Sequence, residues 1–203
     1  MDNPFFDSSD QSGLLRGRCL PHWQQSGKFV FVTFRLSDSL PQSVLDIYVH
    51  EKEDWCKKHP KPWNENDSKE YYERFSMRME KWLDAGAGNC LLSKRNNKRI
   101  VADALEFFDD ERYELLSYVV MPNHVHVLVR LIGDSKLTEI VKSWKSFTAR
   151  QINNAEGRTG HVWQSESFDH IIRSEQQLYK VAKYIYDNNP KSAYVKHFDW
   201  LEN

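Results

Sequence analysis

The amino-acid sequence predicts an α+β protein in which an antiparallel sheet is covered by helices. Segments rich in β-branched and aromatic residues, which are typical of strands, alternate with longer segments of helical pattern. Two of the strand-like segments, residues 113–120 and 124–131, are separated only by Met-Pro-Asn, which predicts a hairpin. The chain has 203 residues, of which 40% are hydrophobic and 28% charged, as expected for one substantial globular domain.

The part of the chain before this hairpin is predicted to contain one strand and three helices. Residues 1–27 are polar and punctuated by Pro and Gly, so we expect an irregular N-terminal arm. Residues 28–36 are rich in Val and Phe and predict a strand. Helices are expected at about residues 44–58, 69–85 and 100–108.

The part after the hairpin is predicted to contain two helices, residues 136–153 and 175–188, with an extended aromatic segment over 163–172 between them. We therefore expect a single domain. The predicted organisation is an arm at 1–27, a domain at 28–195 with a helical insertion at about 42–110, and a tail at 196–203.

His124 and His126 are two residues apart on the second strand of the hairpin. Successive side chains on a strand point to opposite faces, so both imidazoles leave the sheet on one side, and Val125, Val127 and Val129 leave it on the other. Such a pair is half of a metal site and needs a third ligand from elsewhere. The alternative is a pair of polar residues on the exposed face of a strand. Leu128 excludes a histidine-triad hydrolase, and no HExxH motif is present.

Tyr184 and Asn188 are four residues apart on the last predicted helix and share one face of it. An apolar stripe runs beside Tyr184, so a structural role in the core is one interpretation. The other is a phenolic nucleophile. Because phenol has a pKa near ~10, attack at neutral pH requires an activating metal or a polarised electrophile, and a metal-bound phosphodiester supplies the latter.

The formal net charge is −1, so any surface that binds a polyanion must be a local patch. Cations and aromatic rings mixed along the chain suit contact with a phosphate backbone and unpaired bases, although a solvated helix edge has the same composition. The candidate DNA-binding residues are Arg16, Arg18, Lys94, Arg95, Lys142, Lys145, Arg150, Arg158, Trp163 and Arg173.

The N-terminal residues have neither the basic region nor the apolar region of a signal peptide, and no apolar run has the length of a membrane span. Three widely spaced cysteines lack C-x-x-C spacing and are expected to be free thiols. We expect a cytoplasmic protein that does not associate with membranes.

The sequence resembles the REP-associated tyrosine transposases, which are relatives of the single-tyrosine transposases of the IS200/IS605 group. The resemblance extends from about Pro21 to Val195 and rests on five motifs that occur in the family's order. The motifs are Phe31-Val-Thr-Phe-Arg-Leu-Ser-Asp-Ser-Leu-Pro41, Met121-Pro-Asn-His-Val-His126, Lys145-Ser-Phe-Thr-Ala149, Val162-Trp-Gln-Ser-Glu-Ser-Phe-Asp-His-Ile-Ile-Arg173 and a Tyr-Ile segment followed by Asn-Pro190.

The resemblance implies a ferredoxin-like sheet and an HUH endonuclease. His124 and His126 would bind Mg²⁺ or Mn²⁺ on the scissile phosphate, and Asn188 would be the third ligand, with Asn189 as the alternative. Tyr184 would attack to leave a 5′-phosphotyrosine and a free 3′-hydroxyl, and Tyr186 is the weaker candidate nucleophile. Softness alone would favour Zn²⁺, Ni²⁺ or Co²⁺ at two imidazoles, but phosphate and amide oxygens harden the site.

The implied substrate is single-stranded DNA that folds as palindromic REP-type hairpins. The implied state is a monomer with the tyrosine helix in cis, although related transposases exchange this helix between the two subunits of a dimer. Two other functions remain open from the sequence: a non-catalytic protein that binds hairpin nucleic acid, and a metal-dependent phosphodiesterase in which water is the nucleophile.

Overall fold

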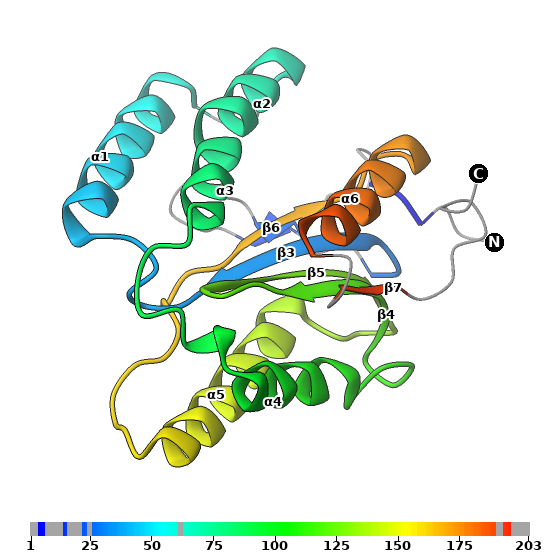
Figure 1. Cartoon of the computed structure of the whole chain (residues 1–203). Coiled ribbons are helices and arrows are strands. Elements are labelled where there is room, and N and C mark those ends of the chain that lie inside the picture. Colours follow the sequence, from blue (N-terminus) through cyan, green and yellow to red (C-terminus); the bar gives the residue numbers. More distant parts are fainter. Residues whose placement is uncertain are drawn as a thin grey trace.

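The computed structural model describes residues 4–6, 14–15, 22–23, 26–60, 63–189 and 193–195. Its centre is a five-stranded antiparallel sheet with the strand order β6-β3-β5-β4-β7 (Figure 1). Helices cover both faces of this sheet, so the predicted α+β class is confirmed. The strands are β3 (Phe29–Arg35), β4 (Tyr113–Val120), β5 (His124–Leu131), β6 (Phe168–Ile171) and β7 (Ala193–Val195).

The connectivity of the sheet is ferredoxin-like, as the resemblance implied. Strands β3 and β4 flank β5 and are both antiparallel to it. Helix α4 (Arg95–Glu106) precedes β4, and helix α5 (Leu137–Glu156) connects β5 to β6. Helix α6 (Glu175–Asn188) and β7 then complete the domain.

The two faces of the sheet carry two hydrophobic layers. Helices α4 and α5 lie on one face, where Val125, Val127 and Val129 enter the larger core (Figure 1). Helix α6 lies on the opposite face and packs its apolar side on Phe31 and Leu128. Because β5 is paired on both edges and covered on both faces, its side chains are buried at every position except Arg130.

Three helical segments between β3 and α4 form a unit with its own aromatic core, and we call them the insertion helices. They stand beside the sheet on the side of α6 (Figure 1). Tyr48, Trp55, Tyr71 and Phe75 are among the buried residues that hold them together. Their bounds are α1 (Gln42–Lys58), α2 (Glu65–Tyr71) and α3 (Met77–Asp84), with the π-helical turn η1 (Tyr72–Ser76) between α2 and α3.

Several element boundaries differ from the predictions. The helix predicted at 69–85 begins at Glu65 and is interrupted by η1. The helix predicted to begin at residue 100 begins at Arg95, because the buried amide of Asn97 donates to Leu91 O and to Glu156 and holds the first turn in place. Of the extended segment 163–172, only β6 is a strand of the main sheet.

The ends of the chain also add strands that the sequence did not predict. A short pair, β1 (Leu14–Leu15) and β2 (His22–Trp23), lies within the predicted irregular arm, and β7 pairs with β4. Cys90 is a free thiol, but Cys56 is disulfide-bonded, so the prediction of free thiols is wrong for Cys56. No helix in the described part of the chain is long and apolar enough to cross a membrane.

Candidate active site and metal centre

Strand β5 places the imidazoles of His124 and His126 on the same face of the sheet, as its alternation predicts. Their Nε2 atoms are 3.0 Å apart. Both residues are 0% exposed, because α6 and the insertion helices cover this face. The pair is therefore not a set of polar residues on the exposed face of a strand.

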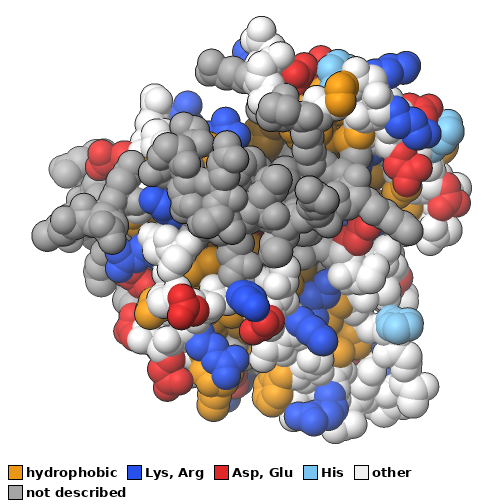
Figure 2. Space-filling view, turned by 180° about the vertical axis from the view of Figure 1, so that it is seen from behind, with side chains coloured by type: hydrophobic (Ala, Val, Ile, Leu, Met, Phe, Trp, Pro, Cys, Tyr) orange, Lys and Arg blue, Asp and Glu red, His pale blue; other side chains and the backbone are white. Residues whose placement is uncertain are grey.

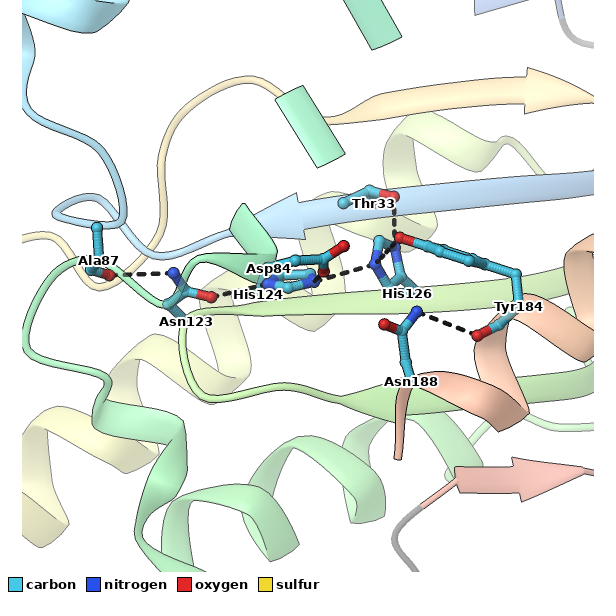
Figure 3. Close-up of polar contacts among 8 residues, drawn as sticks. All are labelled: Thr33, Asp84, Ala87, Asn123, His124, His126, Tyr184 and Asn188. Atoms are coloured by element: carbon cyan, nitrogen blue, oxygen red, sulfur yellow. Dashed lines mark hydrogen bonds and ion pairs between the residues drawn. The ribbon is translucent and has the colours of Figure 1, made fainter. Parts of the chain in front are cut away.

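The ring of His124 is held by Asn123 through a hydrogen bond of 2.7 Å between Nδ1 and Oδ1 (Figure 3). The Asn123 amide nitrogen donates to Ala87 O at 3.0 Å, and a carbonyl can only accept. The amide oxygen must therefore be the atom that faces His124, and Nδ1 must carry the proton. This leaves a lone pair on His124 Nε2, directed towards His126.

The ring of His126 is held by Thr33 and Phe31 from the neighbouring strand β3. Thr33 is opposite His126 in the antiparallel register, and its Oγ1 lies 2.8 Å from Nδ1. The Phe31 ring stacks on the imidazole with centroids 5.4 Å apart and planes 20° apart. A hydrogen bond to one nitrogen and a stacked ring fix the direction of the other nitrogen, as is usual for histidines that bind metal.

Burial keeps both imidazoles neutral at pH 7. It lowers the pKa of His124 to about 4. The pKa of His126 is lowered well below its ordinary value, first by burial and then by the neighbouring His124. Neutral imidazole is the form that binds a metal ion, so neither ring needs to lose a proton at neutral pH.

Asp84, the last residue of α3, adds a carboxylate to the histidine pair. Its Oδ1 lies 3.6 Å from His124 Nε2, and the three potential ligand atoms of Asp84, His124 and His126 lie within 4.8 Å of one another. Figure 3 shows the carboxylate beside the two imidazoles. Two imidazoles and a carboxylate suit a divalent cation. Asp84 was not among the candidate ligands predicted from the sequence, because no motif at its position marks it as one.

Tyr184 approaches the histidine pair from α6. Its hydroxyl oxygen lies 3.4 Å from His126 Nε2, and the side chain is half-buried (Figure 3). Burial raises the pKa of Tyr184 above its ordinary value, and the charge of Glu80 raises it further. The phenol is therefore protonated at neutral pH in the absence of a cation.

Asn188 lies one turn after Tyr184 on the same helix, as its spacing predicts. Its Nδ2 donates to Tyr184 O at 3.1 Å, which leaves the amide oxygen as the atom available to a ligand (Figure 3). Asn189 is the C-cap residue that follows the last residue of α6. Tyr186 is 46% exposed, whereas the ring of Tyr184 lies against His126 with centroids 5.2 Å apart.

Glu80 is a second acidic residue of α3 near this site and was also missed by the sequence analysis. It lies one helical turn before Asp84, so the two share a face of α3. Burial, followed by the charge of Asp84, raises the pKa of Glu80 to about 7.

The predicted DNA-binding residues do not form one surface. Lys142, Lys145 and Trp163 line a cleft of about 1030 Å³ between α1 and α5, which also contains Arg35 and Lys52 together with Glu53 and Glu166. Lys142 is exposed, whereas Lys145 donates to Ser165 O at 2.9 Å, and burial followed by the charge of Arg35 lowers its pKa to about 8. In Figure 2, Lys and Arg side chains are visible in the lower half of the face opposite that of Figure 1.

Trp163 is buried, with its ring 4.9 Å from that of Phe34 and its Nε1 donating to Thr148 Oγ1 at 2.8 Å. Its ring is therefore a core element and is not free to stack on a base in this conformation.

The remaining candidates are dispersed over the surface. Lys94 pairs with Glu156, and Arg173 lies over the Phe6 ring at 5.2 Å. Arg95 and Arg150 are exposed on α4 and α5, and Arg158 is partly buried. Arg16 and Arg18 lie outside the described residues.

Comparison with known proteins gives the class to which this fold and site belong. Residues 89–188 match the family described as "Transposase IS200 like", and this match contains the hairpin, the histidine pair and Tyr184. The segment of residues 89–188, which carries the candidate site, is therefore similar to the IS200-like transposases.

Its curated relatives within this class are REP-associated tyrosine transposases. The one from Escherichia coli is 30% identical over 93 residues, which are 45% of this chain and 53% of the relative. A Haemophilus influenzae protein provisionally given the same name is 27% identical over 99 residues, or 43% of this chain and 56% of that protein. The chain thus spans about half the length of the curated relatives that it matches.

Among solved structures, the chain is similar to a REP-associated tyrosine transposase bound to a REP hairpin. The TM-score is 0.45 at 18% identity, over 85% of this chain and 72% of that one. A transposase-like structure from Deinococcus radiodurans has a TM-score of 0.37 at 15% identity, over 79% of this chain and 89% of that one.

Proposed function

We propose that this chain is a metal-dependent, single-strand-specific DNA endonuclease and strand transferase that acts on REP-type hairpin DNA with Tyr184 as nucleophile. The observation that carries the proposal is the position of the Tyr184 hydroxyl, 3.4 Å from the neutral, oriented His124–His126 pair of the same chain. A tyrosine with only a structural role does not need to direct its hydroxyl at a potential metal site.

His124 and His126 would hold the cation through Nε2, and the Asn188 amide oxygen would be a further ligand from the tyrosine helix. The donors fit Mg²⁺ or Mn²⁺ once phosphate oxygens join them. When bound, the ion would polarise the scissile phosphodiester and offset the charge that develops on it.

The residues of the chain would have three tasks in this reaction. Asn123 and Thr33 keep the imidazoles oriented, and Phe31 keeps the His126 ring in place. Helix α6 presents Tyr184 to the phosphorus atom.

The Tyr184 oxygen forms a bond to phosphorus while the bond between phosphorus and the 3′ oxygen breaks. The phenol loses its proton and the 3′ oxygen gains one, so the products are a 5′-phosphotyrosine and a free 3′-hydroxyl. Attack by a 3′-hydroxyl on the phosphotyrosine would reverse the step without ATP.

The choice of substrate follows the relatives. One solved neighbour is described as bound to a REP hairpin, and we expect this chain to recognise a similar element. Exposed cations such as Lys142, Arg95 and Arg150 would contact the phosphate backbone, which makes binding dependent on salt.

The test is an adduct assay with a single-stranded hairpin oligonucleotide labelled at its 3′ end. Cleavage that leaves a 5′-phosphotyrosine attaches the label to the protein, which then migrates as a shifted band on a denaturing gel. We expect this band with Mn²⁺ or Mg²⁺, its loss in Tyr184→Phe, and its persistence in Tyr186→Phe, the matched control on the same helix.

The alternative functions give different results in this assay. Cleavage that survives in Tyr184→Phe without an adduct would identify water as the nucleophile. Replacement of both histidines by Ala abolishes cleavage in either enzyme. Hairpin binding without cleavage under every metal condition would identify a binding protein.

A further inference from the structure

The carboxylate of Asp84 lies next to the histidine pair but comes from the insertion helices, outside the segment that matches the family, residues 89–188. We propose that Asp84 is a ligand of the same divalent cation as His124 and His126, so that the insertion helices are part of the metal centre. This inference rests on the proposed function, because it concerns the same site.

The arrangement of lone pairs supports a cation between these groups. Asn123 fixes the proton of His124 on Nδ1, so Nε2 presents a lone pair to the Asp84 oxygen 3.6 Å away. A carboxylate oxygen and an unprotonated imidazole nitrogen repel each other, and His124 in this tautomer has no proton on Nε2 to donate to Asp84. A bound cation turns this repulsion into two attractive contacts.

The distances between the three potential ligand atoms are close to those around a bound cation, so only a small movement of Asp84 would be needed for coordination. Two adjacent ligands of an octahedral ion with bonds of about 2.1 Å lie about 3.0 Å apart. The Nε2 atoms of His124 and His126 are 3.0 Å apart, and the Asp84 oxygen is 3.6 Å from the nearer one. The Asp84 side chain is 37% exposed at the end of its helix, so it can rotate to shorten this distance.

Contacts other than the metal already hold the end of the insertion in position. Ala87, three residues after Asp84, accepts the hydrogen bond from Asn123 at 3.0 Å. The backbone N–H of Asn89 donates to Asp38 Oδ2 at 3.0 Å, and Gly88 passes so close to the Asp38 carbonyl that a Cβ there would lie 2.4 Å from its oxygen. Asp84 is thus preorganised beside β5, which lowers the cost of coordination.

A carboxylate ligand also explains how a site with two imidazoles could prefer a hard divalent cation. Two neutral imidazoles alone favour softer ions, whereas a carboxylate oxygen favours Mg²⁺ and Mn²⁺ and supplies a negative charge. Coordination by Asp84 would also make the cation a cross-link between α3 and β5, so that metal binding stabilises the position of the insertion helices.

The first experiment measures Mn²⁺ affinity in the absence of DNA, from the electron paramagnetic resonance signal of the free ion. We expect Asp84→Asn to weaken binding by about tenfold or more, because even partners that only orient a ligand contribute about 10–100-fold. The matched control is Asp103→Asn, which removes the same charge from an exposed side chain of α4, on the other face of the sheet. This substitution should leave the Mn²⁺ affinity unchanged. His124→Ala should abolish binding.

The second experiment needs no substitution and so does not depend on how Asp84→Asn folds. Amide hydrogen exchange of the full chain is compared with and without Mn²⁺. We expect slower exchange in α3 as well as in β5 when Mn²⁺ is present, and loss of the α3 effect in Asp84→Asn.

Unchanged Mn²⁺ affinity in Asp84→Asn, or protection confined to β5, would overturn the role of Asp84 even if the wild type forms the DNA adduct. Conversely, a Mn²⁺ site that depends on Asp84 in a protein that forms no adduct would support this inference and refute the proposed function.

Discussion

The hydrogen bond between Thr33 and His126 offers a test of how the metal site is organised, through the substitution Thr33→Val. Valine has nearly the shape of threonine, so the change removes a hydroxyl and little volume. Thr33 is 3% exposed and His126 0%, and their 2.8 Å bond leaves no space for water to replace the hydroxyl. An unsatisfied buried nitrogen costs about 1–3 kcal/mol, which is the loss expected in the free energy of unfolding.

The same substitution should weaken metal binding, because the His126 ring would lose the partner of its Nδ1. Loss of a group that orients a histidine ligand costs about 10–100-fold in metal affinity. Urea denaturation measures the first effect, and titration of free Mn²⁺ by electron paramagnetic resonance measures the second.

The matched control is Thr148→Val on the opposite side of the sheet. Thr148 is also buried, donates to Trp144 O and accepts from Trp163 Nε1. We expect a comparable loss of stability with unchanged Mn²⁺ affinity. Equal effects of the two substitutions on Mn²⁺ binding, or no effect of either, would show that the Thr33 hydroxyl does not set the orientation of His126.

Further predictions concern the surroundings of the site. Burial raises the pKa of Glu80 from 4.5 to about 7, so the folded state favours the protonated carboxyl. The contribution of this protonation to the free energy of unfolding is fully present below pH 4.5 and is lost as the pH rises through about 7. Glu80→Gln should therefore stabilise the fold relative to wild type by up to about 3 kcal/mol at pH 8 and should not stabilise it at pH 4. Urea denaturation at the two pH values measures this difference, and a difference that does not depend on pH would contradict the prediction. Gly88→Ala should cost more than about 1 kcal/mol in thermal unfolding, because φ is +92° and the added Cβ would meet the Asp38 carbonyl, whereas Gly86→Ala, with free space around its Cβ, should cost less. Asn123→Ala should lower Mn²⁺ affinity about 10–100-fold, since the His124 tautomer is no longer fixed, and an unchanged affinity would refute the role given to the Asn123 amide.

The parts of the fold that the sequence predicted correctly are those determined by local pattern. The hairpin of β4 and β5 and the bounds of α6 follow from turn residues and hydrophobic spacing within a few residues. The common face of His124 and His126 follows from strand alternation alone. The shared face of Tyr184 and Asn188 follows in the same way from helical spacing, and Asn188 accordingly bonds to the Tyr184 carbonyl.

The parts that were missed depend on contacts between distant segments. Asp84 reaches the histidines because a π-helical turn and an aromatic core determine the direction of α3. Neither feature can be predicted from the spacing of charged residues in the sequence. Burial of the histidine face depends on α6, which comes some fifty residues later. Trp163 was predicted to contact DNA because cations lie near it in the sequence, but in the fold its ring contacts Phe34 and its Nε1 donates to Thr148.

Helix α6 crosses the histidine face with both of its ends attached to the same sheet. It follows β6 at one edge, and the chain after it returns as β7 at the other edge, where β7 pairs with β4. Exchange of this helix with a second copy would require β7 to leave its partner strand, so we expect nucleophile and histidines to act within one polypeptide. A mixture of Tyr184→Phe and His124→Ala copies should then show no complementation, and joining two DNA ends would require two intact molecules.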